Sequence, residues 1–204
     1  MKKQEIIEFG KQLYAKDLTF ATSGNISIKT DEGILITASG TALGNLTSDD
    51  ISLIDFDGNL ISGKKPSCEK QLHVEIYKQR PDVKAIIHTH PVNLTTFAVC
   101  HQPLNEPIMS ENILYFEDIP VAEYAMPSST ELVEKTIQHL NNRDVVMMAN
   151  HGAIAIADSL LSAFYKMETA EYYAKVTLNT RILGKPKNLS DKDVQDLVNL
   201  KNSK

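Results

Sequence analysis

The chain has 204 residues and a net charge of −5, with 42 % hydrophobic and 23 % charged residues. The length suits one domain with a sizeable core. The net negative charge does not favour binding to nucleic acid or to an anionic membrane. No apolar run approaches the roughly 20 residues that span a bilayer, and the polar start over 1–5 is not a signal peptide, so a cytoplasmic enzyme or binding protein is expected. Two isolated cysteines, Cys68 and Cys100, indicate neither a disulfide framework nor a redox motif.

Helical and strand-like segments alternate along the chain. Apolar residues at helical spacing predict helices, and short β-branched runs between turn residues predict strands. In chain order we expect a helix (4–16), three strands (25–29, 34–37, 51–55), a helix (67–80), a strand (85–88), a helix (92–100), one or two strands (113–121), a helix (128–140), two strands (145–149, 154–157) and two helices (158–183, 190–200). The expected N-caps are Ser67, Ser128 and Asp158. This interleaving predicts a layered α/β sheet in a single domain over 1–204, with 183–204 as a C-terminal tail.

Two histidines at the end of a predicted buried strand carry the strongest chemical signal. His88 and His90 follow the apolar run 85–87. Residues two apart on a strand point to the same face of the sheet, so both imidazoles are expected to be aimed together from one rigid element. For such a pair alone, a strand end with two hydrogen-bonded histidines and no metal is the ordinary alternative.

A third histidine and a carboxylate place this pair in a metal-binding context. His151 also ends an apolar strand, and Gly152 after it lets the backbone approach closely. Glu69 lies in the first turn of its predicted helix, where the helix dipole by itself also favours a carboxylate. Three imidazoles and a carboxylate form a ligand set that zinc accepts. A zinc ion polarises a carbonyl as a Lewis acid, and Glu69 could then take the α-proton, which suits C–C cleavage, epimerisation or dehydration of a hydroxyketone.

The remaining histidines carry weaker signals. His73 follows Glu69 by one helical turn, so both lie on one helix face. It could support the metal ligands from behind, or it could be a packed core histidine. His101 and His139 are expected near helix ends, exposed or capping.

Three turns could bind an anion through backbone N–H groups and hydroxyls. They lie at 22–25, 37–41 and 66–68, the last at a predicted helix N-terminus, where phosphate is favoured. Each is also explained as an ordinary turn, because Ser, Gly and Asn favour turns. The sequence contains neither GxxxxGK[ST] nor GxGxxG, so nothing indicates a nucleotide.

Taken together, these motifs resemble the class II aldolase/adducin family. The matching motifs are TSGNIS (22–27), TASG (37–40), KPSCE (65–69), HTHP (88–91) and NHG (150–152). Five motifs in the family's order and spacing, over residues 5–180, are far more specific than any one of them. The resemblance is strongest to members that cleave L-fuculose 1-phosphate.

The resemblance implies a fold, a metal and a reaction. The fold is a three-layer α/β/α domain with a central, mostly antiparallel sheet, usually assembled as a homotetramer with active sites at subunit interfaces. The implied ligands of one Zn²⁺ per subunit are Glu69, His88, His90 and His151. Glu69 then becomes the acid/base catalyst once substrate displaces it. The implied reaction is retro-aldol cleavage of a ketose 1-phosphate to dihydroxyacetone phosphate and an aldehyde, through a zinc-stabilised enediolate.

The resemblance also assigns the phosphate-binding positions. They are Gly24, Asn25, Ser39, Gly40, Ser67 and Cys68. The family often has a second hydroxyl where Cys68 stands, and a thiol is a weaker donor. The aldolases use tyrosines at the aldehyde end of the substrate, whereas 91–114 contains none and none follows Tyr173; Tyr115 is the remaining candidate.

Other activities stay open on the same scaffold. Residues 109–113 are similar to a stretch where methylthioribulose-1-phosphate dehydratases carry an acid/base glutamate, which makes Glu111 a candidate for proton transfer or else an exposed loop carboxylate. A pentulose-phosphate 4-epimerase is a further alternative, although the short tail lacks the tyrosine that such enzymes use. A non-catalytic, adducin-like assembly domain is expected to have lost ligands, and all four are present here.

Overall fold

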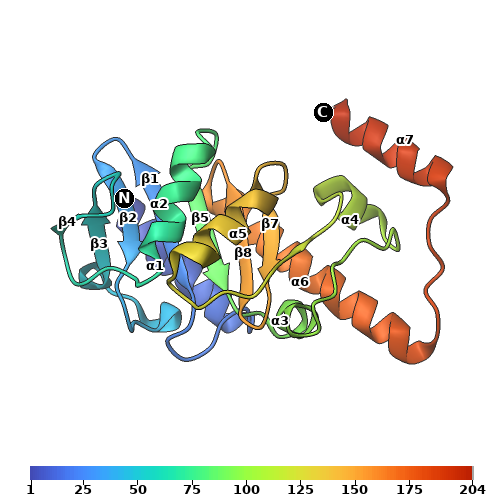
Figure 1. The fold of residues 1–204 in the computed structure, drawn as a ribbon, viewed down its shortest axis with the longest axis horizontal. Helices are drawn as coiled ribbons and strands as arrows, with labels where there is room; N and C mark the ends of the chain where they lie inside the picture. Colours follow the sequence, from blue (N-terminus) through green and yellow to red (C-terminus); the bar gives the residue numbers. More distant parts are fainter. Residues whose placement is uncertain (204) are drawn as a thin grey trace.

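Residues 1–203 are described by a computed structural model, and in them eight strands form one mixed sheet with helices packed against it (Figure 1). The strands are β1 (Asn25–Thr30), β2 (Gly33–Thr37), β3 (Ile51–Ile54), β4 (Leu60–Ser62), β5 (Ala85–Thr89), β6 (Val121–Ala122), β7 (Val145–Met148) and β8 (Gly152–Ala157). The α-helices are α1 (Lys2–Ala15), α2 (Lys70–Gln79), α3 (Val92–Val99), α4 (Ser110–Tyr115), α5 (Thr130–Leu140), α6 (Leu160–Leu183) and α7 (Asp191–Asn202). None of the helices in this part of the chain combines the length and apolar character that a bilayer-crossing segment needs.

The strand order across the sheet is β4-β3-β2-β1-β5-β8-β7-β6. Strands β6 and β7 pair in parallel, and the other neighbours within residues 1–203 pair antiparallel. The α/β fold with a large central sheet is therefore as predicted, and the sheet is mixed. The register places Asn25 of β1 and Ile154 of β8 on either side of His88 in β5.

Side chains of the central strands alternate between two hydrophobic clusters. Ile87 of β5 packs with α1, α3 and α6, whereas its neighbour Ile86 packs with α2 and α5. Because successive strand residues point to opposite faces, His88 and His90 share the face of Ile86. That face is the one covered by α2, the helix that begins directly after Glu69.

One stretch of the sequence prediction was wrong. Residues 113–121 were expected to form strands, but Ile113 lies in helix α4 and β6 begins only at Val121. The Asn112 side chain accepts a hydrogen bond from the backbone N–H of Met109 at 2.9 Å, which caps the first turn of α4. Ile113 is thus buried from a helix. The short edge strand β4 was not predicted.

Helix starts differ from the predicted caps by one or two residues. The observed N-caps are Glu69 for α2, Ser129 for α5 and Ser159 for α6, in place of the predicted Ser67, Ser128 and Asp158. Ser67 instead accepts a hydrogen bond from the backbone N–H of Glu69 at 3.2 Å.

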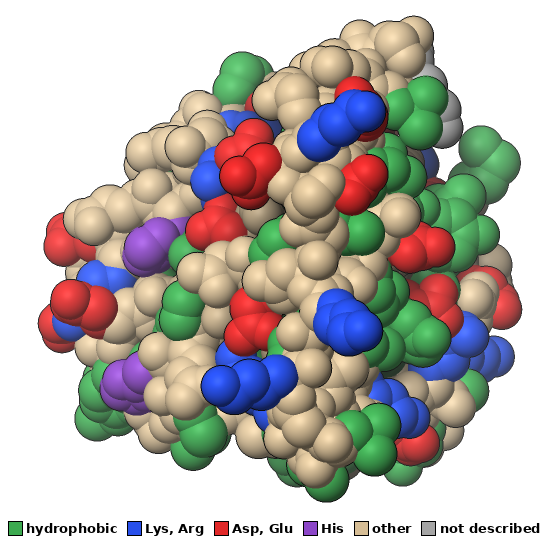
Figure 2. Space-filling model, turned by 90° about the vertical axis from the view of Figure 1, so that its right-hand side faces the viewer, with side chains coloured by type: hydrophobic (Ala, Val, Ile, Leu, Met, Phe, Trp, Pro, Cys, Tyr) green, Lys and Arg blue, Asp and Glu red, His purple; other side chains and the backbone are tan. Residues whose placement is uncertain are grey.

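The C-terminal half of α6 extends beyond the sheet, α4 packs beside it, and α7 packs against α4 (Figure 1). Figure 2 views the molecule from this end, where acidic and basic side chains are intermingled over the surface. The histidine cluster and the predicted phosphate turns lie elsewhere, at one end of strands β1, β5 and β8.

Candidate active site

Strand ends and one tight turn bring the three predicted metal-binding histidines together. His88 and His90 come from the end of β5, and His151 comes from the turn between β7 and β8. Asn150 opens this turn with φ 55°. A Cβ at Gly152 would lie 2.4 Å from Cδ2 of His90, so only glycine lets the turn approach the imidazole.

Four potential ligand side chains face one another in this cluster. The distances are 3.1 Å between Nε2 of His90 and Nε2 of His88, 3.2 Å between Oε2 of Glu69 and Nε2 of His88, and 3.4 Å between Oε1 of Glu69 and Nε2 of His151. Nδ1 of His88 lies 2.9 Å from the carbonyl oxygen of Ala153. A carbonyl only accepts hydrogen bonds, so Nδ1 carries the proton and Nε2 of neutral His88 offers its lone pair to the cluster.

This geometry fits a metal ion. The three histidine ligand atoms lie within 4.8 Å of one another. An ion bound tetrahedrally at roughly 2.0–2.1 Å separates its ligand atoms by about 3.3–3.4 Å, close to the spacings above. Oε1 of Glu69 is buried and has no hydrogen-bond partner among residues 1–203. A buried carboxylate oxygen is costly to leave unpaired, and a cation at the centre of the cluster removes that cost.

The electrostatics of the cluster favour cation binding. Burial raises the pKa of Glu69, but the neighbouring His88 and His151 outweigh it and hold that pKa well below its usual range. Burial lowers the pKa of His90 to about 3 and that of His151 to about 4, with the charge of His88 acting in the same direction. For His88, burial is outweighed by the Glu69 carboxylate, and its pKa is raised. Near neutral pH Glu69, His90 and His151 are therefore already deprotonated, as metal ligands must be.

The predicted phosphate positions line the same hollow as the histidines. Those lining it are Gly24, Asn25, Ser39, Gly40, Ser67 and Cys68. Gly24 has φ +81°, and a Cβ there would lie 2.7 Å from the backbone oxygen of His88, so glycine brings this turn against β5. Gly40 has φ +75° and open space around its Cα, which leaves its backbone accessible to a ligand. Pro127 and Ser128 also line the hollow and were not predicted as site residues from the sequence.

The structure does not bring Glu111 to the histidines within one chain. It lies exposed on α4, in a separate hollow that it shares with Tyr115 of α4 and Tyr172 of α6. None of the four candidate ligands lines that hollow. Any contact between Glu111 and the histidine cluster would therefore have to come from another subunit.

His73, whose role the sequence left open, is fully buried behind the cluster. Its Nε2 lies 2.6 Å from Oδ1 of Asn25, and Nδ2 of Asn25 lies 2.9 Å from Oε2 of Glu69. The spacing from Glu69 to His73 signalled a shared helix face, but the link through Asn25 depends on the pairing of β1 with β5.

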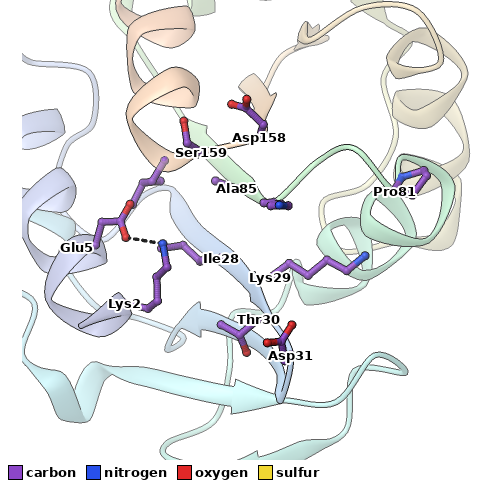
Figure 3. Close-up of a pocket in the computed structure, with 12 residues that line it drawn as sticks. Lys2, Glu5, Ile28, Lys29, Thr30, Asp31, Pro81, Ala85, Asp158 and Ser159 are labelled. Atoms are coloured by element: carbon purple, nitrogen blue, oxygen red, sulfur yellow. Dashed lines mark hydrogen bonds and ion pairs between the residues drawn. The ribbon is translucent and has the colours of Figure 1, made fainter.

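A second pocket lies at the opposite end of β1 and β5 (Figure 3). It is lined by charged side chains from several elements, among them the half-buried Lys29 and the exposed Asp31 and Asp158. None of the predicted site residues belongs to it. This pocket is larger than the hollow at the histidines, so size alone does not identify the candidate active site.

Comparison with known proteins identifies the family of this chain. The family described as "Class II Aldolase and Adducin N-terminal domain" matches residues 4–178. The chain is 35 % identical over 178 residues to an L-fuculose phosphate aldolase of Methanocaldococcus jannaschii, covering 87 % of this chain and 96 % of the relative. It is 31 % identical over 205 aligned residues to a 3-oxo-tetronate 4-phosphate decarboxylase of Haemophilus influenzae, covering 97 % and 96 %.

A solved L-fuculose 1-phosphate aldolase has the same fold. It aligns with a TM-score of 0.90 at 34 % identity, over 97 % of this chain and 94 % of that chain. The chain therefore belongs to the class II aldolase and adducin family.

Proposed function

We propose that the chain is a Zn²⁺-dependent aldolase that cleaves a ketose 1-phosphate, L-fuculose 1-phosphate or a relative, to dihydroxyacetone phosphate and an aldehyde. The observation that carries the proposal is the convergence of four ligand side chains, with three contacts of 3.1–3.4 Å between them, beside turns with accessible donors. Family membership and the relatives named L-fuculose phosphate aldolase support this reaction class.

The residues divide the chemistry between them. When bound by His88, His90 and His151, zinc supplies a Lewis acid for the oxygens of the substrate's hydroxyketone. The Glu69 carboxylate, displaced by substrate, moves the proton at the carbon next to the ketone. Backbone N–H groups and hydroxyls of the turns around Gly24, Ser39 and Ser67 hold the phosphate.

We further propose that the whole chain acts as one domain and assembles as a homotetramer. Glu111 is separated from the histidines within a chain, so its proposed role in proton transfer needs an active site at a subunit interface. The proposal predicts that the preferred substrate changes when α4 is altered, because the aldehyde end of the substrate would lie there.

A second candidate is decarboxylation of 3-oxo-tetronate 4-phosphate. It is favoured by the 31 % identity to a decarboxylase over 97 % of this chain. Loss of CO₂ from a 3-oxo acid and retro-aldol cleavage both leave negative charge beside a ketone, so the same electrophile serves both. A methylthioribulose-1-phosphate dehydratase or a pentulose-phosphate 4-epimerase needs a similar site.

Product analysis separates these reactions. Protein of measured metal content is incubated separately with L-fuculose 1-phosphate, 5-deoxyribulose 1-phosphate, methylthioribulose 1-phosphate and 3-oxo-tetronate 4-phosphate. Chelator-sensitive release of dihydroxyacetone phosphate, read by a coupled reductase, supports the aldolase and ranks its substrates. Release of CO₂ or loss of water without dihydroxyacetone phosphate would move the assignment to the decarboxylase or the dehydratase.

A further inference from the structure

A chain of buried polar groups runs from Glu69 into the core, between α2 and β1. Glu69, His73 and Tyr77 are spaced four residues apart and line one face of α2. Asn25 and Ser27 are two apart on β1 and point to that face. Apart from Glu69, at 7 % exposed, these side chains are at most 4 % exposed.

The contacts in this chain are short and continuous. The Ser27 hydroxyl lies 2.8 Å from the Tyr77 hydroxyl and 2.7 Å from Nδ1 of His73. Nε2 of His73 lies 2.6 Å from Oδ1 of Asn25, whose Nδ2 donates to Oε2 of Glu69 at 2.9 Å. Buried groups in such a chain must satisfy one another, because water does not reach them.

Chemistry sets the direction of each hydrogen bond. The ionised Glu69 carboxylate only accepts, so Nδ2 of Asn25 faces it and Oδ1 faces His73. Oδ1 also only accepts, so Nε2 of His73 carries the proton and its Nδ1 accepts from Ser27. Burial lowers the pKa of His73 to about 3, which keeps the ring neutral, so only one of its two nitrogens carries a proton.

We propose that His73 is a positioning residue, which through Asn25 anchors Oε2 of Glu69 and leaves Oε1 for the metal and for proton transfer. Oε2 accepts from Nδ2 of Asn25 at 2.9 Å and also lies 3.2 Å from Nε2 of His88. Oε1 lies 3.4 Å from Nε2 of His151 and is the buried carboxylate oxygen without a hydrogen-bond partner among residues 1–203. The inference rests on the proposed function of Glu69. It adds that the two oxygens of Glu69 are not interchangeable and that the fixed Asn25 amide decides between them.

Two substitutions at His73 test this role. His73→Leu removes both ring nitrogens, whereas His73→Gln keeps an N–H donor that can reach Asn25. We expect His73→Leu to lower kcat about 10–100-fold with KM changed less than about threefold, and His73→Gln to recover most of that loss. Ile76→Val on the same helix is the packing control, because Ile76 is equally buried and makes no polar link. A His73→Leu variant that folds and keeps wild-type kcat would overturn the proposal.

Metal affinity gives a readout that does not depend on turnover. Zinc affinity is measured by chelator competition for His73→Leu in two backgrounds, wild type and Glu69→Ala. We expect about a tenfold weakening in the wild-type background and no change in the Glu69→Ala background, because His73 acts through Glu69. Equal weakening in both backgrounds would mean that His73 supports the fold or the other ligands, and would overturn the proposal.

Two further outcomes stay decisive. If His73→Leu does not fold, Tyr77→Phe removes the hydroxyl at the far end of the hydrogen-bonded chain. A two- to fivefold loss of kcat in the wild-type background, with no effect of the same substitution in the Glu69→Ala background, supports the proposal. Unchanged kcat and zinc affinity in Tyr77→Phe would then contradict it. If the wild-type protein turns over no sugar phosphate, the proposed function fails, while the affinity cycle still decides whether His73 positions Glu69.

Discussion

The two ends of strands β1 and β5 carry pockets of opposite character. At one end Asn25 pairs with His88, and at the other Ile28 pairs with Ala85. Around His88 the polar atoms are buried and face one another at 3.1–3.4 Å. In the pocket of Figure 3 the charged groups are exposed or half-buried, and Lys2 and Glu5 pair there at 3.0 Å.

This contrast shows what marks a functional site in this fold. Exposed ion pairs are screened and solvated, so they need no further partner. Buried lone pairs that face one another repel unless a proton or a cation lies between them. A proton or a cation held between its groups therefore stabilises the histidine end, and the opposite end needs neither.

Removing a ligand tests the contrast most severely. We expect His90→Ala to lose its metal and at least about a thousandfold in activity, because Lewis-acid stabilisation is worth several kcal/mol. Metal analysis after gel filtration and the coupled cleavage assay measure both losses. Circular dichroism should show an intact fold, and an active His90→Ala protein without metal would refute the assigned site.

Glu69→Gln distinguishes the role of Glu69 as a metal ligand from its role in proton transfer. The amide oxygen can still reach the cation, but the side chain no longer exchanges a proton. We expect the metal content to stay near wild type and kcat to fall about 100-fold or more. Should kcat remain within tenfold of wild type, Glu69 would be only a ligand.

The phosphate turns should change binding more than chemistry. Ser39 is exposed into the hollow, and a hydrogen bond to a charged group contributes about 1.5–3 kcal/mol. Ser39→Ala should therefore raise KM about 10–100-fold with kcat nearly unchanged. Initial-rate kinetics over a wide substrate range measure the split. A fall in kcat at constant KM would place Ser39 outside the phosphate contact.

Lowering the pH should reduce the free energy of unfolding of the metal-free protein, because its buried histidines have lowered pKa values. The folded pKa values of His73 and His90 are about 3, and that of His151 is about 4. Below about pH 6.5 the unfolded chain binds protons that the folded chain does not, so this stability is present above pH 6.5 and is lost as the pH falls towards 3–4. Each group contributes on the order of 1.4 kcal/mol per pH unit in that window, and His88, whose pKa is raised, opposes the trend.

Urea unfolding of the chelator-treated protein at pH 7 and pH 5 measures this effect. We expect a lower midpoint at pH 5. A midpoint that is unchanged or higher at pH 5 would mean that the cluster is not buried and deprotonated in solution. The zinc-loaded protein at pH 7 is the reference, because bound metal adds its own stabilisation.

The smallest effect is expected at the opposite end. Asp158 is exposed in the pocket of Figure 3, so Asp158→Asn should change stability by less than about 0.5 kcal/mol and kcat/KM by less than about twofold. Thermal unfolding and the cleavage assay measure both. A large loss of activity would show that this pocket also serves the reaction.

The sequence predicted the parts of the site that follow from strand geometry. The apolar run before His88 signalled β5, and its two-residue spacing placed His90 on the same face. The NHG turn signalled the approach of His151. These inferences held because buried strands and glycine turns leave local patterns.

The parts that the sequence did not predict depend on contacts between distant segments. The role of His73 required knowing that Asn25 lies opposite His88 across a strand pair. Helix α4 was missed because its apolar residues suit a strand equally well, and the Asn112 cap decided for a helix. Glu111 lies on that helix, so its place relative to the histidines could not be inferred either.

The most direct test is X-ray diffraction from crystals of the catalytically active, metal-loaded protein, recorded on both sides of the zinc absorption edge. We expect one anomalous peak per chain, within roughly 2.0–2.2 Å of Nε2 of His88, His90 and His151. A peak in the opposite pocket, or active crystals with no peak between the three histidines, would contradict the assignment of the metal site.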